Sequence, residues 1–165
     1  MYMYLKRYLV LILICTITLF LDQYTKNAVL QLLHQRNIHS FKINSFLNFT
    51  EVWNQGVSFG FLSDYNLSPL FFIVITMLIV ILILCLMKNV PPILQGMIIG
   101  GAFGNIADRF LFGRVFDFID LHVYGWHYPA FNLADSFIVF SIIIIITKVM
   151  FFSHRNHPKN FRHLL

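Results

Sequence analysis

The stretch FNLADSFIVFSIIIIIT, Phe131 to Thr147, places one carboxylate, Asp135, at the start of a run that is apolar enough to cross a bilayer. About 20 largely apolar residues are what one membrane-spanning helix requires. An ionised side chain inside hydrocarbon is costly, so an acid at the edge of such a run usually faces protein or water and usually has a function. The stretch therefore predicts a membrane helix with a functional carboxyl group at one end.

The rest of the chain has the same apolar character. Of its 165 residues, 58% are hydrophobic and 12% are charged, and a soluble core of this length cannot bury so much apolar surface. We predict an all-α membrane protein of one domain, residues 1–165, with a small extracytoplasmic β-rich segment at the membrane surface. Its four transmembrane helices are expected at about residues 5–21, 69–87, 93–112 and 131–152. The extracytoplasmic segments are then 22–68 and 113–130, and the cytoplasmic tail is 153–165.

The net charge of +5 is better explained by membrane orientation than by nucleic acid, because the basic residues form no stripe with interleaved aromatic residues. We therefore expect no nucleic-acid partner. By the positive-inside rule, the places where Lys and Arg gather around apolar runs are cytoplasmic, which puts both termini inside. The basic tail is expected to lie near anionic membrane lipid. The residues concerned are Lys6, Arg7, Lys88, Lys148, Arg155, Lys159 and Arg162.

The first apolar run, within MYMYLKRYLVLILICTITLF, resembles a secretory or lipoprotein signal, because basic residues precede an apolar stretch that contains a Cys. Ile14 precedes Cys15, where a processing site needs a small residue, so we interpret the run as a retained first helix. Cys15 and Cys85 both lie inside apolar runs and indicate neither a disulfide nor a metal site.

The first extracytoplasmic segment contains FKINSFLNFTEVWNQGVSFGFL, in which apolar and polar residues alternate at close to a two-residue period. This pattern predicts short strands at the membrane surface, with a turn at NQG. Two uses remain open at this stage: a platform for an extended peptide, or a hairpin that caps the helix bundle.

The third span carries polar residues at helical spacing. Asn105 and Arg109 are four residues apart and share a face, with Asp108 adjacent. Since the third span runs outward and the fourth returns, they should lie beside Asn132 and Asp135. For single residues the alternatives are structural: Asp108 and Arg109 neutralise each other, or Asn132 caps the last helix. The cluster as a whole favours a functional site.

The third span also carries Gly96, Gly100 and Gly104 at four-residue spacing. Such a smooth face lets a neighbouring backbone come close, so we assign these glycines to packing rather than chemistry.

Two carboxyl groups that share a site cannot both ionise cheaply, so one keeps its proton. The ionised member can deprotonate a water while the neutral one donates to a carbonyl oxygen, which is peptide hydrolysis without a metal or cofactor. Other chemistries are less well supported. Ser58 and Ser136 lie in no motif that supplies a base, and a zinc site built from His122 and His127 with Asp117 or Asp120 lacks a recognised ligand spacing.

Five motifs in order, LDQYTK, NQGVSFG, GGAFGNIADR, VFDFID and FNLADS, resemble those of the lipoprotein signal peptidases (signal peptidase II), which are bacterial membrane aspartyl proteases. The resemblance covers nearly the whole chain. It implies that Asp117 and Asp135 are the catalytic pair, although spacing alone does not favour Asp117 over Asp120. It also implies an ion-pair role for Asp108 beside Arg109. The implied substrate- and inhibitor-contacting residues are Asn54, Asn105, Arg109 and Asn132.

The resemblance further implies the reaction. The substrate would be a prolipoprotein whose lipobox Cys carries diacylglycerol, cut just before that Cys to release the signal peptide. The site would face the outer leaflet of the bacterial cytoplasmic membrane and would be the target of peptide inhibitors such as globomycin. Two other classes remain as alternatives: a small ion-coupled transporter, which should carry acids along a path through the bilayer, and a non-catalytic assembly subunit.

Overall fold

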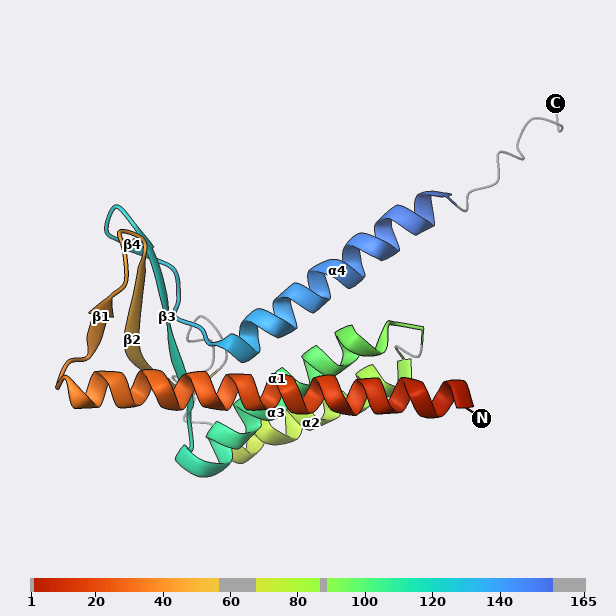
Figure 1. Cartoon of the computed structure of the whole chain (residues 1–165), viewed down its shortest axis with the longest axis horizontal. Helices are drawn as coiled ribbons and strands as arrows, with labels where there is room; N and C mark the ends of the chain where they lie inside the picture. The colour runs from red at the N-terminus through yellow and green to blue at the C-terminus, as the bar shows by residue number, and fades with distance from the viewer. Residues whose placement is uncertain (1, 57–67, 87–88, 156–165) are drawn as a thin grey trace, which may run out of the picture.

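The computed structural model describes residues 2–56, 68–86 and 89–155. The first three helices lie along one another, and a small antiparallel sheet lies at the end of the molecule remote from the N-terminus (Figure 1). The last helix starts at the sheet and diverges from the other three along its length. In chain order the elements are α1 Tyr2–Gln35, β1 Ser40–Lys42, β2 Leu47–Asn54, α2 Pro69–Leu86, α3 Pro92–Phe112, β3 Val115–Val123, β4 Trp126–His127 and α4 Leu133–Arg155.

Helix α1 does not end at Leu21, where the first span was expected to stop, but continues to Gln35 over 34 residues. At 1.5 Å per residue it is about 50 Å long, against about 30 Å of bilayer hydrocarbon. The extra turns pack on the sheet, where Val29 and Leu33 form a buried cluster with Phe116 and Phe118. The first part of the expected outer segment 22–68 is therefore helical and supports the sheet.

Among the described residues, three helices are long and apolar enough to cross a membrane, Tyr4–Gln35, Pro69–Leu86 and Leu133–Phe151. Helix α3 does not belong to this group. It lies against α1, α2 and α4, so much of its surface is covered by protein. That cover allows α3 to carry small and polar residues such as Gln95, Asn105 and Asp108 that a lipid-facing helix would avoid.

The glycines of α3 are confirmed as packing residues. A Cβ atom at Gly100 would lie 2.5 Å from the carbonyl oxygen of Cys15, and one at Gly96 would lie 2.8 Å from that of Leu11. At Gly104 the added atom would meet the carboxylate of Asp22. Close approach of α1 and α3 therefore depends on the missing side chains, and it brings polar residues of the two helices within bonding distance.

The sheet has the strand order β1-β2-β3-β4, with every pair antiparallel. Strands β1 and β2 confirm the expectation of short strands, whereas the rest of that stretch, from residue 57, lies outside the described residues. Strand β3 was not expected. It pairs with β2 through Val52 and Asp117, and Phe131 adds an isolated bridge to Ile119 just before α4 begins. This bridge carries the chain directly from the sheet into the last helix.

The ends of the helices remote from the sheet are also tied together. Arg7 Nη2 donates to the backbone oxygen of Val90 at 2.8 Å and to Oε1 of Gln95 at 3.0 Å. The start of α1 and the connection from α2 to α3 therefore lie at the same end of the molecule, opposite the sheet (Figure 1).

Candidate active site

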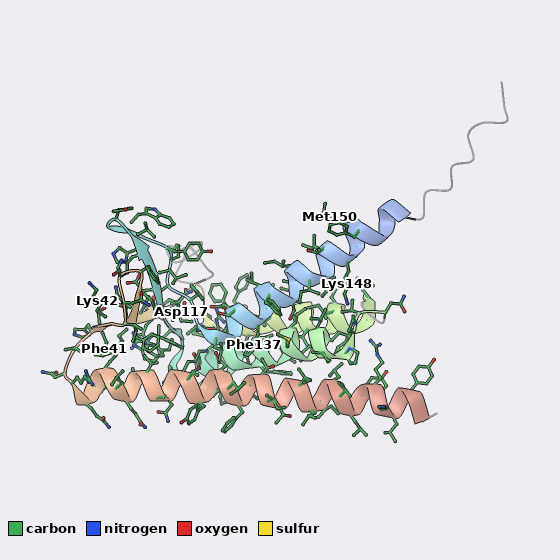
Figure 2. The ribbon with its side chains drawn as sticks, turned by 45° about the horizontal axis from the view of Figure 1, so that its top comes forward. Phe41, Lys42, Asp117, Phe137, Lys148 and Met150 are labelled. Carbon is green, nitrogen blue, oxygen red and sulfur yellow. The ribbon has the colours of Figure 1, made fainter. Side chains whose placement is uncertain are left out.

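The candidate site forms where β3 meets the helices, and Figure 2 shows Asp117 at this junction. Successive side chains of a strand point to opposite faces. Since Phe116 and Phe118 pack toward the end of α1, Asp117 between them points the other way, toward α3 and α4. The residue is almost completely buried.

Helix α4 begins with a reciprocal cap that also belongs to the site. Oδ1 of Asn132 accepts from the backbone N–H of Asp135 at 3.0 Å, and Oδ2 of Asp135 accepts from the backbone N–H of Asn132 at 3.2 Å. The alternative that Asn132 is a helix cap is thus correct but incomplete. Its Nδ2 also donates to Oδ1 of Asp117 at 2.7 Å, so this fully buried residue links the two carboxyl groups, one through its side chain and the other through its backbone N–H.

Two further amides donate to the same pair. Nδ2 of Asn105 donates to Oδ1 of Asp135 at 2.9 Å, which joins the end of α3 to the start of α4. Nδ2 of Asn54, the last residue of β2, donates to Oδ2 of Asp117 at 3.0 Å. Four elements therefore hold the two carboxyl groups, and the structure brings Asn54, Asn105 and Asn132 together with Asp117 and Asp135.

Lys26 of α1 fixes which way these amides point. Its Nζ donates to Oδ1 of Asn105 at 3.1 Å, and an ammonium group can only donate, so Nδ2 of Asn105 must face Asp135. The same Oδ1 accepts from Nδ2 of Asn132 at 3.0 Å, which turns that Nδ2 toward Asp117 as well. One buried cation thereby orders the donors around both carboxyl groups.

Lys26 is itself held by two buried acids of α1 and α3. Its Nζ lies 2.8 Å from Asp22 and 2.9 Å from Asp108. Asp22 also accepts from the backbone N–H of Ala134 at 2.9 Å, and Asp108 accepts from that of Phe116 at 3.0 Å. The ion-pair network therefore connects α1, α3, the start of β3 and the start of α4.

This network corrects one expectation and adds residues that were missed. Asp108 has the ion-pair role that was expected, but its partner is Lys26 and not Arg109, because neighbouring helix residues point in different directions. Asp22 and Lys26 were placed in an outer segment and were given no structural role. The signal that could have found them is the Asp–Lys pair at i and i+4, directly after an apolar helix.

Arg109 lies one helical turn beyond Asn105 on α3. Its Nη2 donates to the backbone oxygen of Gly56 at 2.9 Å, just beyond β2. It lines a cavity of about 250 Å³ together with Asn54, Asn105, Asp117 and Asp135 and with apolar residues of α2, α3 and α4. The cavity therefore has the two carboxyl groups, two amides and a guanidinium group at its polar end, and an apolar remainder.

Burial, followed by the negative charge of nearby Asp135, raises the pKa of Asp117 from 3.8 to about 7. The hydrogen bonds from Asn54 and Asn132 act in the opposite direction and are too weak to cancel this effect. At neutral pH and below, Asp117 can therefore hold a proton that an ordinary aspartate would have lost.

Asp120 has a different environment. It is three positions from Asp117 along β3, so the two side chains point to opposite faces of the sheet. It accepts from Nδ2 of Asn48 at 2.9 Å and lies 2.7 Å from Nδ1 of His127. Burial raises its pKa, but these hydrogen bonds outweigh that effect and the pKa is lower than usual. Within the described part of the chain, no three His, Cys, Asp or Glu side chains are grouped closely enough to hold a metal.

The serine alternatives have no support in the described residues. The hydroxyl of Ser136 donates to the backbone oxygen of Asn132 at 3.0 Å, as helix residues often do. Ser58 lies outside the residues that the structure describes.

Comparison with known proteins supports one family. Residues 14–151 match the family model described as signal peptidase (SPase) II. The chain is 36% identical over 155 residues to the lipoprotein signal peptidase of Pelagibacter ubique, covering 90% of this chain and 91% of that protein. It is 37% identical over 139 residues to that of a Janthinobacterium species, covering 81% and 83%. A solved bacterial membrane enzyme superposes with a TM-score of 0.73 at 31% identity, covering 90% of this chain and 92% of its own. The chain belongs to the signal peptidase II family.

Proposed function

We propose that this protein is a lipoprotein signal peptidase of the aspartic type, which cuts prolipoproteins just before the diacylglyceryl-modified Cys of the lipobox. The observation that carries the proposal is the linkage of Asp117 and Asp135 through one residue, Asn132, whose side-chain amide donates to Asp117 at 2.7 Å and whose backbone N–H donates to Asp135 at 3.2 Å. Two carboxyl groups from different elements, held by shared donors beside a cavity, are the arrangement that metal-free peptide hydrolysis needs.

In the proposed mechanism, Asp117 enters the reaction protonated and Asp135 ionised. Asp135 takes a proton from a water, whose oxygen attacks the carbonyl carbon of the scissile bond, while Asp117 donates its proton to the carbonyl oxygen. The tetrahedral intermediate then collapses, the C–N bond breaks and the leaving nitrogen takes a proton from the pair. The signal peptide leaves with a new carboxyl group, and the Cys keeps a free amine.

The direct test is cleavage of a purified, diacylglyceryl-modified prolipoprotein by the purified protein in lipid or detergent. We expect release of the signal peptide, inhibition by globomycin, and much slower turnover of the same prolipoprotein without lipid. Equal turnover of both forms would contradict the proposed substrate class, and no turnover of either would contradict the activity.

We propose that α3 is the fourth span and that both termini are cytoplasmic, in the bacterial cytoplasmic membrane. This arrangement is supported by Arg7, which joins the start of α1 to the α2–α3 connection. It is also supported by the basic residues Lys6 and Lys88, which lie in these two parts of the sequence. From Leu5 to Leu21, α1 rises about 25 Å, so Asp22 and the site beside it lie near the outer boundary of the hydrocarbon.

Reporter fusions test this topology. Fusions at His34 and Gly125 should behave as external, and fusions at Asn89 and His163 as internal. The measurement is the activity of paired reporters that work on only one side of the membrane. An external signal at His163 would contradict a cytoplasmic C-terminus and with it the even number of spans.

We propose that Arg109 and Asn54 hold the substrate backbone rather than transfer protons. Losing a charge-assisted hydrogen bond costs about 1.5 to 3 kcal/mol, so Arg109→Ala should lower kcat/KM by about 10- to 100-fold, and Asn54→Ala should also lower it. Arg114→Ala is the matched control, because Arg114 stacks on Trp53 at 4.5 Å and does not line the cavity. Full activity of both Arg109→Ala and Asn54→Ala would show that these residues do not bind substrate.

The rate should decrease as pH rises above about 7. The pKa of Asp117 is raised to about 7, so its proton is present below this pH and is lost above it. Once the proton is lost, kcat/KM should decrease by about tenfold for each pH unit, as measured with lipid-modified substrate below KM, because kcat/KM reports the pKa values of the free enzyme. The variant Asp120→Asn should show the same basic limb, since Asp120 lies outside the pair. A rate that stays constant to pH 9 would contradict the assignment of this proton.

A further inference from the structure

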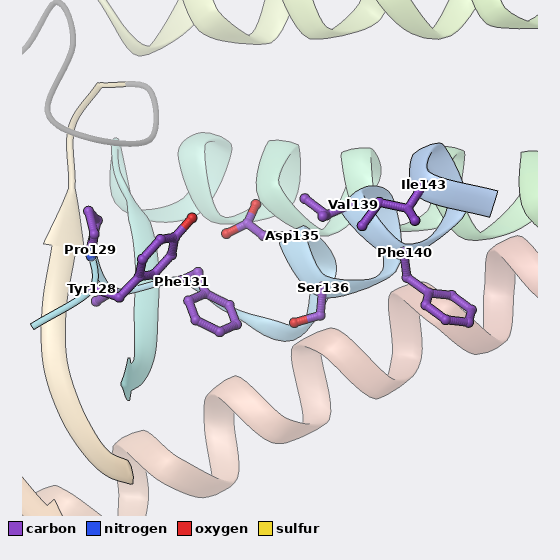
Figure 3. Close-up of a pocket in the computed structure, with 9 residues that line it drawn as sticks. Tyr128, Pro129, Phe131, Asp135, Ser136, Val139, Phe140 and Ile143 are labelled. Atoms are coloured by element: carbon purple, nitrogen blue, oxygen red, sulfur yellow. The ribbon is translucent and has the colours of Figure 1, made fainter. Parts of the chain in front are cut away.

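A second cavity, of about 380 Å³, begins at the candidate site and follows α4 away from it (Figure 3). It is lined by segment 128–131 and by Asp135, Ser136, Val139, Phe140 and Ile143 of α4. In Figure 3, Tyr128 and Phe131 lie toward one end of the group and Phe140 and Ile143 toward the other, with Asp135 and Ser136 between them.

The two cavities lie against different faces of α4. The cavity that contains both carboxyl groups meets this helix at Asp135, Ile138 and Ile142. At 100° per residue, Val139 and Ile143 lie on a neighbouring face, and it is this face that lines the second cavity. Asp135 borders both cavities, so a molecule that reacts there has two separate routes away from the carboxyl group.

The second cavity is mainly apolar and has its polar side chains near Asp135. Tyr128 and Ser136 lie there with Asp135 among the apolar side chains of 129–131, and farther along α4 Val139, Phe140 and Ile143 supply only hydrocarbon. From Asp135 to Ile143 the helix rises about 12 Å. Val139, Phe140 and Ile143 are each more than half exposed, so this part of the cavity opens toward the bilayer. These properties match an ester group followed by an acyl chain.

We propose that the second cavity binds an acyl chain of the diacylglyceryl group on the substrate Cys; this inference rests on the proposed function. The modified Cys follows the scissile bond directly, so its side chain must leave the site within a few ångströms of Asp135. The first cavity holds Asn54, Arg109 and both carboxyl groups, which are the contacts that an extended peptide requires. The lipid therefore takes the route along the other face of α4, and its binding places the bond before the Cys at the carboxyl pair.

The inference is tested by filling the cavity with a larger side chain. Val139→Trp should raise KM for a prolipoprotein with two palmitoyl chains by about tenfold. A change of this size corresponds to the loss of burial of about two methylene groups of the acyl chain. Its kcat should stay within about twofold of wild type. Ile146→Trp is the matched control, because Ile146 is also exposed on α4 and lies one turn beyond the lining residues. A substrate with two butyryl chains should show no difference among the three proteins.

A second measurement locates the chain directly. A photoreactive group near the middle of one acyl chain of the substrate should label segment 128–143 of the wild-type protein, and Val139→Trp should reduce this labelling. An unchanged KM for Val139→Trp together with cleavage by the wild type would overturn the acyl-chain site and leave the proposed function intact. Equal effects of Val139→Trp and Ile146→Trp would overturn it as well. Absence of cleavage by the wild type would instead overturn the proposed function.

Discussion

Asp117→Asn and Asp135→Asn should each lower the turnover of a lipid-modified prolipoprotein by about 10²- to 10⁴-fold, the range that general acid–base catalysis supplies. An amide has the size of a carboxyl group, but it can neither take a proton from water nor give one to a carbonyl oxygen. The measurement is signal-peptide release by the purified variants at saturating substrate. Asp120→Asn is the matched control, since Asp120 lies on the same strand and bonds to Asn48 and His127 instead.

Loss of activity must be separated from loss of structure. Both oxygens of Asp117 accept N–H groups, from Asn132 and Asn54. In Asp117→Asn the new NH2 group would therefore face one of these N–H groups, and no hydrogen bond could form between them. The same holds at Asp135, whose oxygens accept from Asn105 and Asn132. Each variant should therefore lose about 1 to 3 kcal/mol of stability and still bind globomycin. Near-normal turnover by Asp135→Asn would mean that this carboxyl group only caps the helix, and the proposed aspartic mechanism would be wrong.

The apolar runs predicted the helical part of the fold well, because length and composition alone identify helices of this kind. They could not predict that α1 continues to Gln35. Its last turns are stabilised by packing of Val29 and Leu33 on β3, a strand that is distant in the sequence. Strand β3 was missed for a related reason: the buried run of Val115 to Phe118 shows no alternation of apolar and polar residues.

The sequence predicted which polar residues gather at the candidate site, but not the contacts that they make with one another. Helical spacing placed Asn105 near Asp135, because the end of the third span and the start of the fourth were expected to lie on the same side of the membrane. The choice between Asp117 and Asp120 needed the strand, since only in a strand does a spacing of three put two residues on opposite faces. The role of Lys26 needed the close approach of α1 and α3, which brings its ammonium group to Asn105.

Lys26→Met should destabilise the protein more than either substitution in the carboxyl pair. It would leave Asp22 and Asp108, both almost completely buried, without the cation between them. Removing one partner of a buried ion pair costs about 3 to 5 kcal/mol, because the remaining charge has neither water nor a counterion. The expected result is a decrease of about 10 °C in the thermal unfolding temperature in detergent. Lys148→Met on the exposed surface of α4 is the matched control and should unfold as the wild type does.

The triple variant Lys26→Met, Asp22→Asn, Asp108→Asn separates the two roles of Lys26. Its neutral amides remove the unpaired charges and can still accept the backbone N–H groups of Ala134 and Phe116, so most of the lost stability should return. Activity should not return, because no cation then orients the amide of Asn105 toward Asp135. Recovery of both stability and turnover would show that Lys26 only neutralises buried acids. If the single variant Lys26→Met unfolded at the same temperature as the wild type, the buried ion pairs themselves would be contradicted.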